Sequence, residues 1–172
     1  MKLPKIITQE EFEKLLVAEE VKKYRLAYLL GFESGMRISE IVGLKGKGGV
    51  VLIKPLTKDK VEKSSIRIEQ GKGKKDRIVP RPKRLNDKAL NLLPLKASRR
   101  AIQNRITNLG YKVLNRRITF HTLRHGFGSH LAGLNMPLHQ IQMLMGHSRL
   151  DTTGIYLHAN PKEAIDKAQE LF

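Results

Sequence analysis

The sequence contains no cysteine. A disulfide framework and a zinc site with thiolate ligands are therefore both excluded, and a chain of this composition suits a reducing compartment. The sequence also has no apolar run that approaches the roughly 18 residues of a membrane span. Its N-terminal segment, MKLPKIITQEEFEKLL, lacks the apolar core of a signal peptide. These absences predict a soluble protein of the cytoplasm.

Acidic residues are scarce. There are 16 aspartates and glutamates against 33 lysines and arginines, so the formal net charge is +17 at pH 7. The basic excess runs from Lys2 to Arg149 rather than forming a tail, and such a surplus predicts a polyanion as the partner. A ribosomal or coating protein would be equally basic, so charge does not separate an enzyme from a packaging module. The 172 residues, of which 40% are apolar, suit one domain with a substantial core.

The spacing of apolar residues predicts helices at both ends of the chain and strands between them. Thr8 followed by Glu11 is a capping box that opens the first helix, and Ser98 suits the cap of a later one. The Gly-Lys-Gly-Lys-Lys-Asp turn at residues 71–76 predicts a hairpin tip. The expected helices cover residues 10–20, 24–33, 38–44, 84–93, 98–109, 122–134, 137–145, 149–157 and 162–172, and the expected strands cover residues 49–53, 65–70 and 76–80. The predicted fold class is therefore mainly α with a small antiparallel β-sheet (α+β).

The stretch from His121 to Tyr156 carries the residues that suggest chemistry. His121 and Arg124 lie three residues apart, which puts both side chains on one face of a helix. A Gly-His-Ser turn at His147 follows, and Tyr156 comes nine residues later. Cations beside a tyrosine hydroxyl suit an attack on a phosphodiester by the phenol oxygen, because they hold the charge that develops on phosphorus. The pattern predicts DNA strand cleavage through a covalent phosphotyrosine.

Five motifs follow one another along the chain: SGMRISEIVGL, GKGKKDRIVP, HTLRHGFGSHL, MGHS and TTGIYLH. In this order they closely resemble the tyrosine recombinase family of phage integrases and Xer proteins, specifically its C-terminal catalytic domain, over about residues 7–171. The resemblance implies the catalytic-domain fold of that family and site-specific cleavage and rejoining of duplex DNA through a 3′-phosphotyrosine. The resemblance implies that no metal and no nucleotide cofactor is needed. It also implies a cytoplasmic protein that is associated with the nucleoid.

The catalytic positions of the family hold competent residue types in this sequence. They are the two phosphate-binding arginines, Arg37 and Arg124; the hairpin lysine, Lys72; the first and second histidines, His121 and His147; and the tyrosine nucleophile, Tyr156. Glu40, three residues after Arg37, could be a solvated helix charge. In the family context we interpret it as an ion-paired buttress that orients Arg37.

Each matched residue has a physical role. A tyrosine hydroxyl has a pKa of about 10, so it needs a proton acceptor, and His121 is the candidate. Guanidinium forks suit the non-bridging oxygens of the phosphate better than an ammonium would. Lys72, with its pKa lowered by neighbouring arginines, would protonate the leaving 5′ oxygen, and Lys74 is its nearest rival. His147 would donate a hydrogen bond to the scissile phosphate.

Further basic residues are candidates for contact with the DNA backbone. Some lie beside Lys72 at the hairpin tip, and others lie near the start of a helix, where a phosphate is favoured. These predicted DNA contacts are Lys74, Lys75, Arg77, Arg99, Arg100 and Arg105. The charges of the hairpin could equally be ordinary solvated ones.

Histidines on the helix after His121 raise a different possibility, a metal site. His125 and His130 have a spacing that could suggest a metal pair. With no cysteine in the chain and no carboxylate between His121 and Leu150, packing or hydrogen-bonding roles are favoured, and we expect no metal.

Three functions compete for this pattern. The first is a recombinase or integrase, and the second is a type IB topoisomerase-like enzyme that relaxes supercoils by the same phosphotyrosine chemistry. The third is a catalytically silent DNA-binding module that keeps the fold. Competent residues at every catalytic position rank the third last, and strand exchange between two sites would separate the first from the second.

The resemblance predicts a single catalytic domain over residues 1–172, without the separate N-terminal DNA-clamping domain that is usual in the family. The interval between Arg37 and Lys72 is longer than is usual. The last segment, KEAIDKAQELF, has an apolar stripe but is too short to be a stable helix alone. In the family such a helix often packs into a neighbouring subunit, so we expect a monomer, or at most weak association, in solution and a tetramer on paired DNA sites through this helix.

Overall fold

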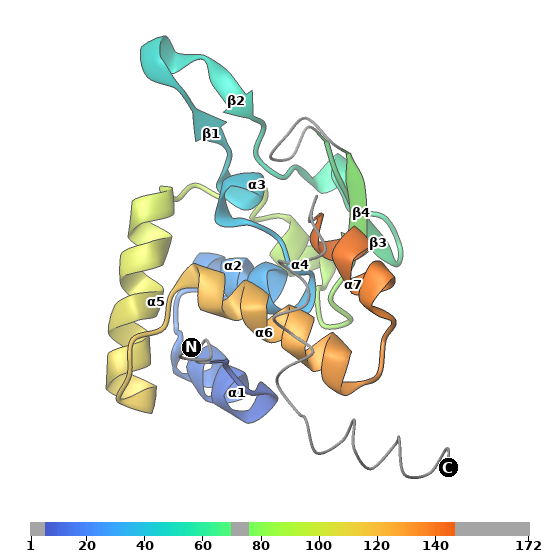
Figure 1. Cartoon of the computed structure of the whole chain (residues 1–172). Helices are drawn as coiled ribbons and strands as arrows, with labels where there is room; N and C mark the ends of the chain where they lie inside the picture. The colour runs from blue at the N-terminus through green and yellow to red at the C-terminus, as the bar shows by residue number, and fades with distance from the viewer. Residues whose placement is uncertain (1–5, 70–75, 147–172) are drawn as a thin grey trace.

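Helices form most of the computed structural model of this chain, which describes residues 6–69 and 76–146, and two short hairpins lie at one side of them (Figure 1). In chain order the elements are α1 (Gln9–Ala18), α2 (Lys22–Glu33), α3 (Ile38–Val42), β1 (Leu44–Lys45), β2 (Val51–Ile53), β3 (Ser65–Ile68), β4 (Arg77–Pro80), α4 (Asp87–Leu90), α5 (Arg99–Leu114), α6 (Phe120–Gly133) and α7 (Leu138–Met145). The predicted α+β class is confirmed. In these two stretches no helix is both long enough and apolar enough to cross a membrane.

Local capping signals set most of the helix starts. The Thr8 hydroxyl accepts from the Glu11 amide at 3.2 Å and the Glu11 carboxylate accepts from the Thr8 amide at 3.0 Å, which confirms the capping box. The Ser98 hydroxyl caps α5 in the same way. The expected helix over 84–93 is wrong in length, because Asn86 is extended and caps a helix of one turn. The helices expected over 149–157 and 162–172 lie outside the described residues.

The main core forms where α2 packs against α6 and α1 packs against α5. Two glycines allow the close approach of α2 and α6. A Cβ on Gly31 would lie 2.7 Å from the Phe120 ring, and one on Gly126 would lie 2.6 Å from both Ile7 and Phe32. A smaller cluster, formed by Phe127, Ile141 and Met145, joins α7 to α6. The helix that carries His121 and Arg124 is thus held on both sides.

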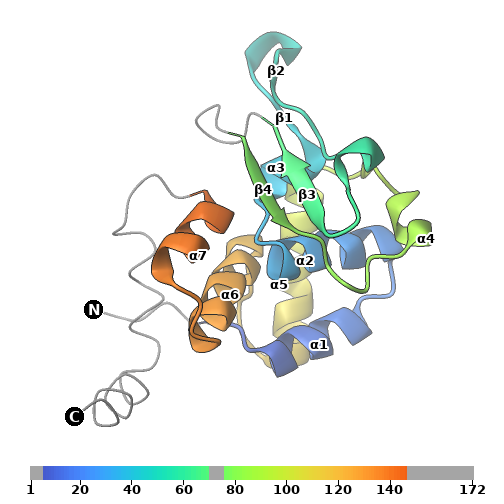
Figure 2. The same cartoon turned by 90° about the vertical axis from the view of Figure 1, so that its right-hand side faces the viewer.

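The strands form two separate hairpins rather than the one small sheet that the sequence predicts. β3 pairs with β4 in antiparallel register, and the paired strands lie beside α7 and above α2 (Figure 2). The expected strand over 49–53 does not join them. Its residues Val51–Ile53 pair instead with Leu44–Lys45, because the glycine-rich turn between them folds the chain back on itself.

A buried carboxylate ties α1 to α5. Glu19 has no exposed surface, and both of its oxygens accept from the Arg105 guanidinium, each at 2.9 Å. Burial by itself raises the pKa of this carboxyl, but the hydrogen bonds and charge of Arg105 outweigh it and lower the pKa below its ordinary value. The Arg105 guanidinium thus has a structural partner in Glu19, while 42% of its side chain stays exposed, so the DNA contact expected at this residue stays a prediction.

We predict that Arg105→Ala destabilises the protein by about 1–3 kcal/mol, because it leaves a buried carboxylate without its cationic partner. Arg100→Ala, on an exposed residue of the same helix, should change stability by less than about 0.5 kcal/mol. Urea unfolding followed by circular dichroism at pH 7 measures both values. Equal stabilities for the two variants would contradict the role of the Glu19–Arg105 pair.

Candidate active site

Arg37 stands where the chain enters α3. It is the N-cap residue of that helix, with extended backbone angles (φ −77°, ψ 147°). The Glu40 carboxylate accepts from the Arg37 amide at 2.7 Å and from its guanidinium Nη1 at 3.0 Å. The short helix therefore fixes both the backbone and the side chain of Arg37 through one acidic residue three positions ahead.

The Glu40 carboxylate is shared between two arginines. It has no exposed side-chain surface, and its oxygens also accept from Arg77, at 2.8 Å from Nη2 and 2.5 Å from Nη1. Burial raises the pKa of Glu40, but the hydrogen bonds and charges of Arg77 and Arg37 lower it overall, so the group is a carboxylate at neutral pH. Our expectation of a DNA contact at Arg77 is wrong, because only 7% of its side chain is exposed and it points inward at Glu40.

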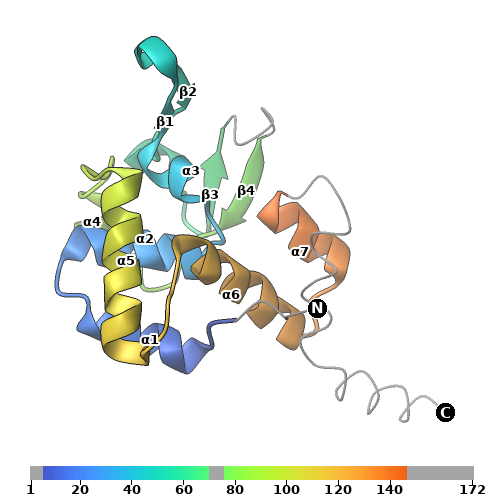
Figure 3. The ribbon, with the colours of Figure 1, turned by 60° about the vertical axis from the view of Figure 1, so that its left-hand side comes forward.

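Three arginines converge on the C-terminal end of α7. Arg77 Nε donates to the Leu144 carbonyl at 3.0 Å and Arg37 Nη2 donates to the Gly146 carbonyl at 3.1 Å. Between them, Arg124 donates to the Met145 carbonyl. These carbonyls have no partner within a helix and carry the negative end of its dipole, so guanidinium groups suit them. Figure 3 shows how α7 lies beside β4 and α6, from which two of these arginines come.

Two glycines make this arrangement possible. Gly146 ends α7 in the left-handed region (φ 60°), and a Cβ there would lie 2.9 Å from the Arg77 side chain. Gly35 is also left-handed (φ 62°), and its carbonyl accepts the second hydrogen bond of Arg124. The sequence predicted neither of these arginine contacts. It does carry a signal for the helix end at Gly146, since a glycine directly follows an apolar helical run.

His121 lies on α6 near Arg124. Partial burial of its ring and the charges of Arg124 and Arg37 lower the pKa of this imidazole, so it is neutral at pH 7. The His125 ring packs edge-on against it, with 4.1 Å between ring centroids. Burial, His121 and Arg124 lower the pKa of His125 to about 4. The structure therefore brings Arg37, Arg124 and His121 into one electrostatic neighbourhood.

Other predicted site residues are placed differently. Arg99 and Arg100 are exposed at the start of α5. Lys72, Lys74, Lys75, His147 and Tyr156 lie outside the described residues.

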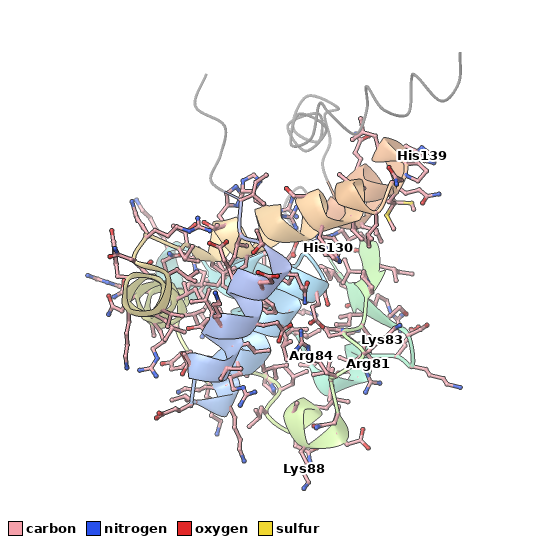
Figure 4. The ribbon with its side chains drawn as sticks, turned by 90° about the horizontal axis from the view of Figure 1, so that it is seen from below. Arg81, Lys83, Arg84, Lys88, His130 and His139 are labelled. Atoms are coloured by element: carbon pink, nitrogen blue, oxygen red, sulfur yellow. The ribbon has the colours of Figure 1, made fainter. Side chains whose placement is uncertain are left out.

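The two other histidines of the described residues do not join a metal site. His130 on α6 and His139 on α7 are exposed and stand apart from each other (Figure 4). Within residues 6–69 and 76–146, no three side chains of the types that bind metals come together.

Comparison with known proteins places this geometry in a family. The family model described as the phage integrase family matches residues 5–163. The chain belongs to this family. Tyrosine recombinase XerA of Thermococcus kodakarensis is 34% identical over 189 aligned residues, covering 98% of this chain and 62% of the relative. XerA of Pyrococcus furiosus is 30% identical, covering 98% of this chain and 63% of the relative. The chain thus spans less than two thirds of these relatives, and the predicted membership among integrases and Xer recombinases is confirmed.

Solved structures of the family share the fold. The crystal structure of XerA recombinase matches with a TM-score of 0.71 at 23% identity, over 99% of this chain and 66% of that one. The catalytic domain of bacteriophage HP1 integrase matches with a TM-score of 0.65 at 21% identity, over 94% of this chain and 93% of that one. XerH recombinase bound to its difH substrate matches with a TM-score of 0.70 at 25% identity, over 98% of this chain and 54% of that one. The predicted catalytic-domain fold is confirmed.

We predict that Arg77→Ala destabilises the protein by about 3 kcal/mol, because it breaks a buried ion pair and leaves the end of α7 with one donor fewer. Arg67→Ala is the matched control. Arg67 is an exposed arginine of the paired strand with a salt bridge to exposed Glu62, and its loss should change stability by less than about 1 kcal/mol. Urea unfolding at pH 7 measures both.

The difference in unfolding free energy between wild type and Arg77→Ala should depend on pH. The lowered pKa of Glu40 means that its stabilisation is present above the ordinary glutamate pKa and is lost as the pH falls through the lower folded value. The gap between wild type and Arg77→Ala should therefore narrow in acid. A gap that stays constant from neutral pH into acid would contradict an ionic partner for Arg77.

Proposed function

We propose that this chain is the strand-transfer unit of a site-specific DNA recombinase, which cleaves and rejoins duplex DNA through a 3′-phosphotyrosine. The observation that carries the proposal is the convergence of Arg37 and Arg124 on the end of α7, with His121 close enough for both of their charges to lower the pKa of its imidazole. Relatives named tyrosine recombinase XerA support it, and so does a XerH relative solved with its DNA substrate.

The proposed chemistry consists of two phosphoryl transfers, first from the DNA to the tyrosine and then from the tyrosine back to DNA. The Tyr156 oxygen attacks phosphorus and gives its proton to His121, while the bond from phosphorus to the 5′ oxygen breaks. Lys72 gives a proton to that 5′ oxygen, which leaves as a hydroxyl. A 5′ hydroxyl from another strand then reverses the attack and releases the tyrosine. The bond energy is kept in the phosphotyrosine, so neither a nucleotide nor a metal is required.

The arginines would stabilise the charge on the transferring phosphate. Arg37 keeps 21% of its side chain exposed, so a phosphate can approach it directly. Arg124 is 3% exposed and binds two carbonyls, so we propose that a phosphate oxygen takes the place of one of them. Both interactions are hydrogen bonds to an oxygen acceptor, and the charged phosphate is the stronger acceptor.

The deciding experiment is covalent trapping on a nicked suicide duplex. Wild-type protein should form an adduct that survives denaturation, and Tyr156→Phe should form none while its DNA affinity stays nearly unchanged. Peptide mapping identifies the attached tyrosine. Tyr28 is a poor rival, because burial and the adjacent Glu19 carboxylate raise the pKa of its phenol. An adduct on the Phe variant, or one mapped to Tyr24 or Tyr111, would overturn the assignment.

Lys72 is proposed to act on the leaving group alone. In a substrate with a 5′-bridging phosphorothiolate, the leaving group is a thiolate, which needs no proton. This substrate should therefore restore cleavage by Lys72→Ala to close to the wild-type rate on the same substrate. Lys74→Ala is the matched control and should cleave the ordinary substrate well. If the rescue appears for Lys74→Ala and not for Lys72→Ala, then Lys74 and not Lys72 protonates the leaving group.

We also propose that recombination requires a tetramer assembled on DNA through the segment after Asn160. Its apolar residues need a partner surface, and a helix of this length is not stable by itself. A variant that ends at Asn160 should bind DNA and form the adduct, but should lose most recombination between two sites. Full recombination by this variant would show that the segment is not needed for assembly.

A further inference from the structure

A two-stranded ribbon stands out from the body of the protein. β1 and β2 project beyond α3, at the top of Figures 1, 2 and 3. We call residues 44–54 the β1–β2 arm. Its base is closed by Gly43, whose backbone (φ 81°) lies so near Ile53 that a Cβ would approach the Ile53 carbonyl to 3.1 Å. The following segment is tied down where the Leu56 amide donates to the Ile41 carbonyl at 3.1 Å.

The outer part of the arm is apolar and uncovered. Val50 is 62% exposed, Val51 is 53% exposed and Leu52 is 55% exposed. Three consecutive exposed apolar residues are unusual on a strand, where one side chain in two would normally turn inward. They belong to neither hydrophobic cluster of the described residues, so the core does not require them.

The arm is also positively charged. It contains Lys45, Lys47 and Lys54, all exposed, and no acidic residue. The tip is a glycine-rich turn in which Gly48 and Gly49 have positive φ, and a Cβ at either would meet open space. Unlike Gly31 and Gly126, these two glycines are not required by close packing. They are required by the positive φ of the turn.

The arm points in the same direction as the end of the other hairpin. In Figures 1 and 3, β3 ends and β4 begins on the side from which the arm projects. Those two strands flank residues 70–75, which include Lys72. At its base the arm follows α3, which begins at Arg37. The arm therefore extends from the candidate active site on the same side of the body as the adjoining ends of β3 and β4.

We propose that the β1–β2 arm is a DNA-contacting ribbon that lies in a groove beside the scissile phosphate, with its lysines on the backbone and Val50–Leu52 against base edges. The major groove, about 12 Å wide, admits a two-stranded ribbon, and strands read DNA this way in β-ribbon proteins. Apolar side chains contact thymine methyl groups there. This inference rests on the proposed function, since it takes the DNA of that reaction as the partner.

A second copy of the chain fits the arm less well. A stable protein interface covers about 800 Å² on each partner, which is more than three side chains at a ribbon tip provide. The flanking lysines would also meet a chain whose net charge is +17. Duplex DNA complements that charge, and counterion release makes each phosphate contact favourable.

Salt titration tests the arm on the full chain. We would measure binding to a fluorescent duplex of mixed sequence by anisotropy, for wild type and for three triple variants. The first replaces Lys45, Lys47 and Lys54 with Ala, and the second replaces Val50, Val51 and Leu52 with Ser. The third is a charge-matched control, Lys83→Ala, Lys88→Ala and Lys96→Ala, in exposed lysines outside the arm.

The variants should differ in how the salt dependence of binding changes. The arm lysine variant should flatten the plot of log affinity against log salt by about 0.9 for each phosphate that is no longer neutralised, up to about 2.7. The serine variant should bind roughly tenfold more weakly with an unchanged slope, because only its apolar surface has been removed. The control should keep the wild-type slope. Circular dichroism should show all variants folded, since the arm lies outside both hydrophobic clusters.

Two results would overturn the arm's assignment to DNA. One is an arm lysine variant with the slope and affinity of wild type. The other is a serine variant that no longer self-associates in sedimentation while its DNA affinity is unchanged, which would assign the face to a second copy. The covalent trapping assay separates this inference from the proposed function. If wild type forms no adduct but the arm variants weaken binding as described, the arm stands and the recombinase chemistry fails.

Discussion

A single buried carboxylate organises the candidate active site. Glu40 accepts from the Arg37 backbone, the Arg37 guanidinium and the Arg77 guanidinium, and no part of its side chain reaches solvent. A buried carboxylate without cationic partners would be strongly unfavourable. Arg37 and Arg77 are therefore required together, and their positions relative to each other are set by the carboxylate between them.

Arg37 and Arg77 also bind the end of α7, together with Arg124. The ion pair with Glu40 is thereby linked to the position of a helix that is distant in sequence. Arg37, Arg77 and Arg124 come from α3, β4 and α6, and they bind three successive carbonyls at residues 144–146. A guanidinium can do this because its donors form a planar fork, whereas a lysine ammonium cannot hold a carboxylate and a carbonyl in fixed directions. Gly146, whose carbonyl accepts from Arg37, directly precedes His147 in the sequence. These arginines therefore fix the backbone immediately before His147.

How much of this could be predicted depends on the distance along the chain between partners. The Thr8–Glu11 box and the Arg37–Glu40 pair are three residues apart, and the sequence predicted both contacts. Arg77 and Arg105 have partners 37 and 86 residues away. A solvated arginine and one held in an ion pair look alike in sequence, so both were expected on DNA. The pairing of Val51–Ile53 was missed for a related reason, since strand propensity does not name the partner strand.

Residues of the site and residues of the arm differ in what a substitution can change. Arg37 and Arg124 bind carbonyls in the folded chain and would bind the phosphate in the proposed chemistry, and Arg77 holds the carboxylate that orients Arg37. A variant at any of them is therefore expected to lose stability and activity together. The lysines and exposed apolar residues of the β1–β2 arm support neither hydrophobic cluster. They can change without disturbing the Glu40 ion pairs. The two kinds of residue meet at Gly43, where α3 ends and the arm begins.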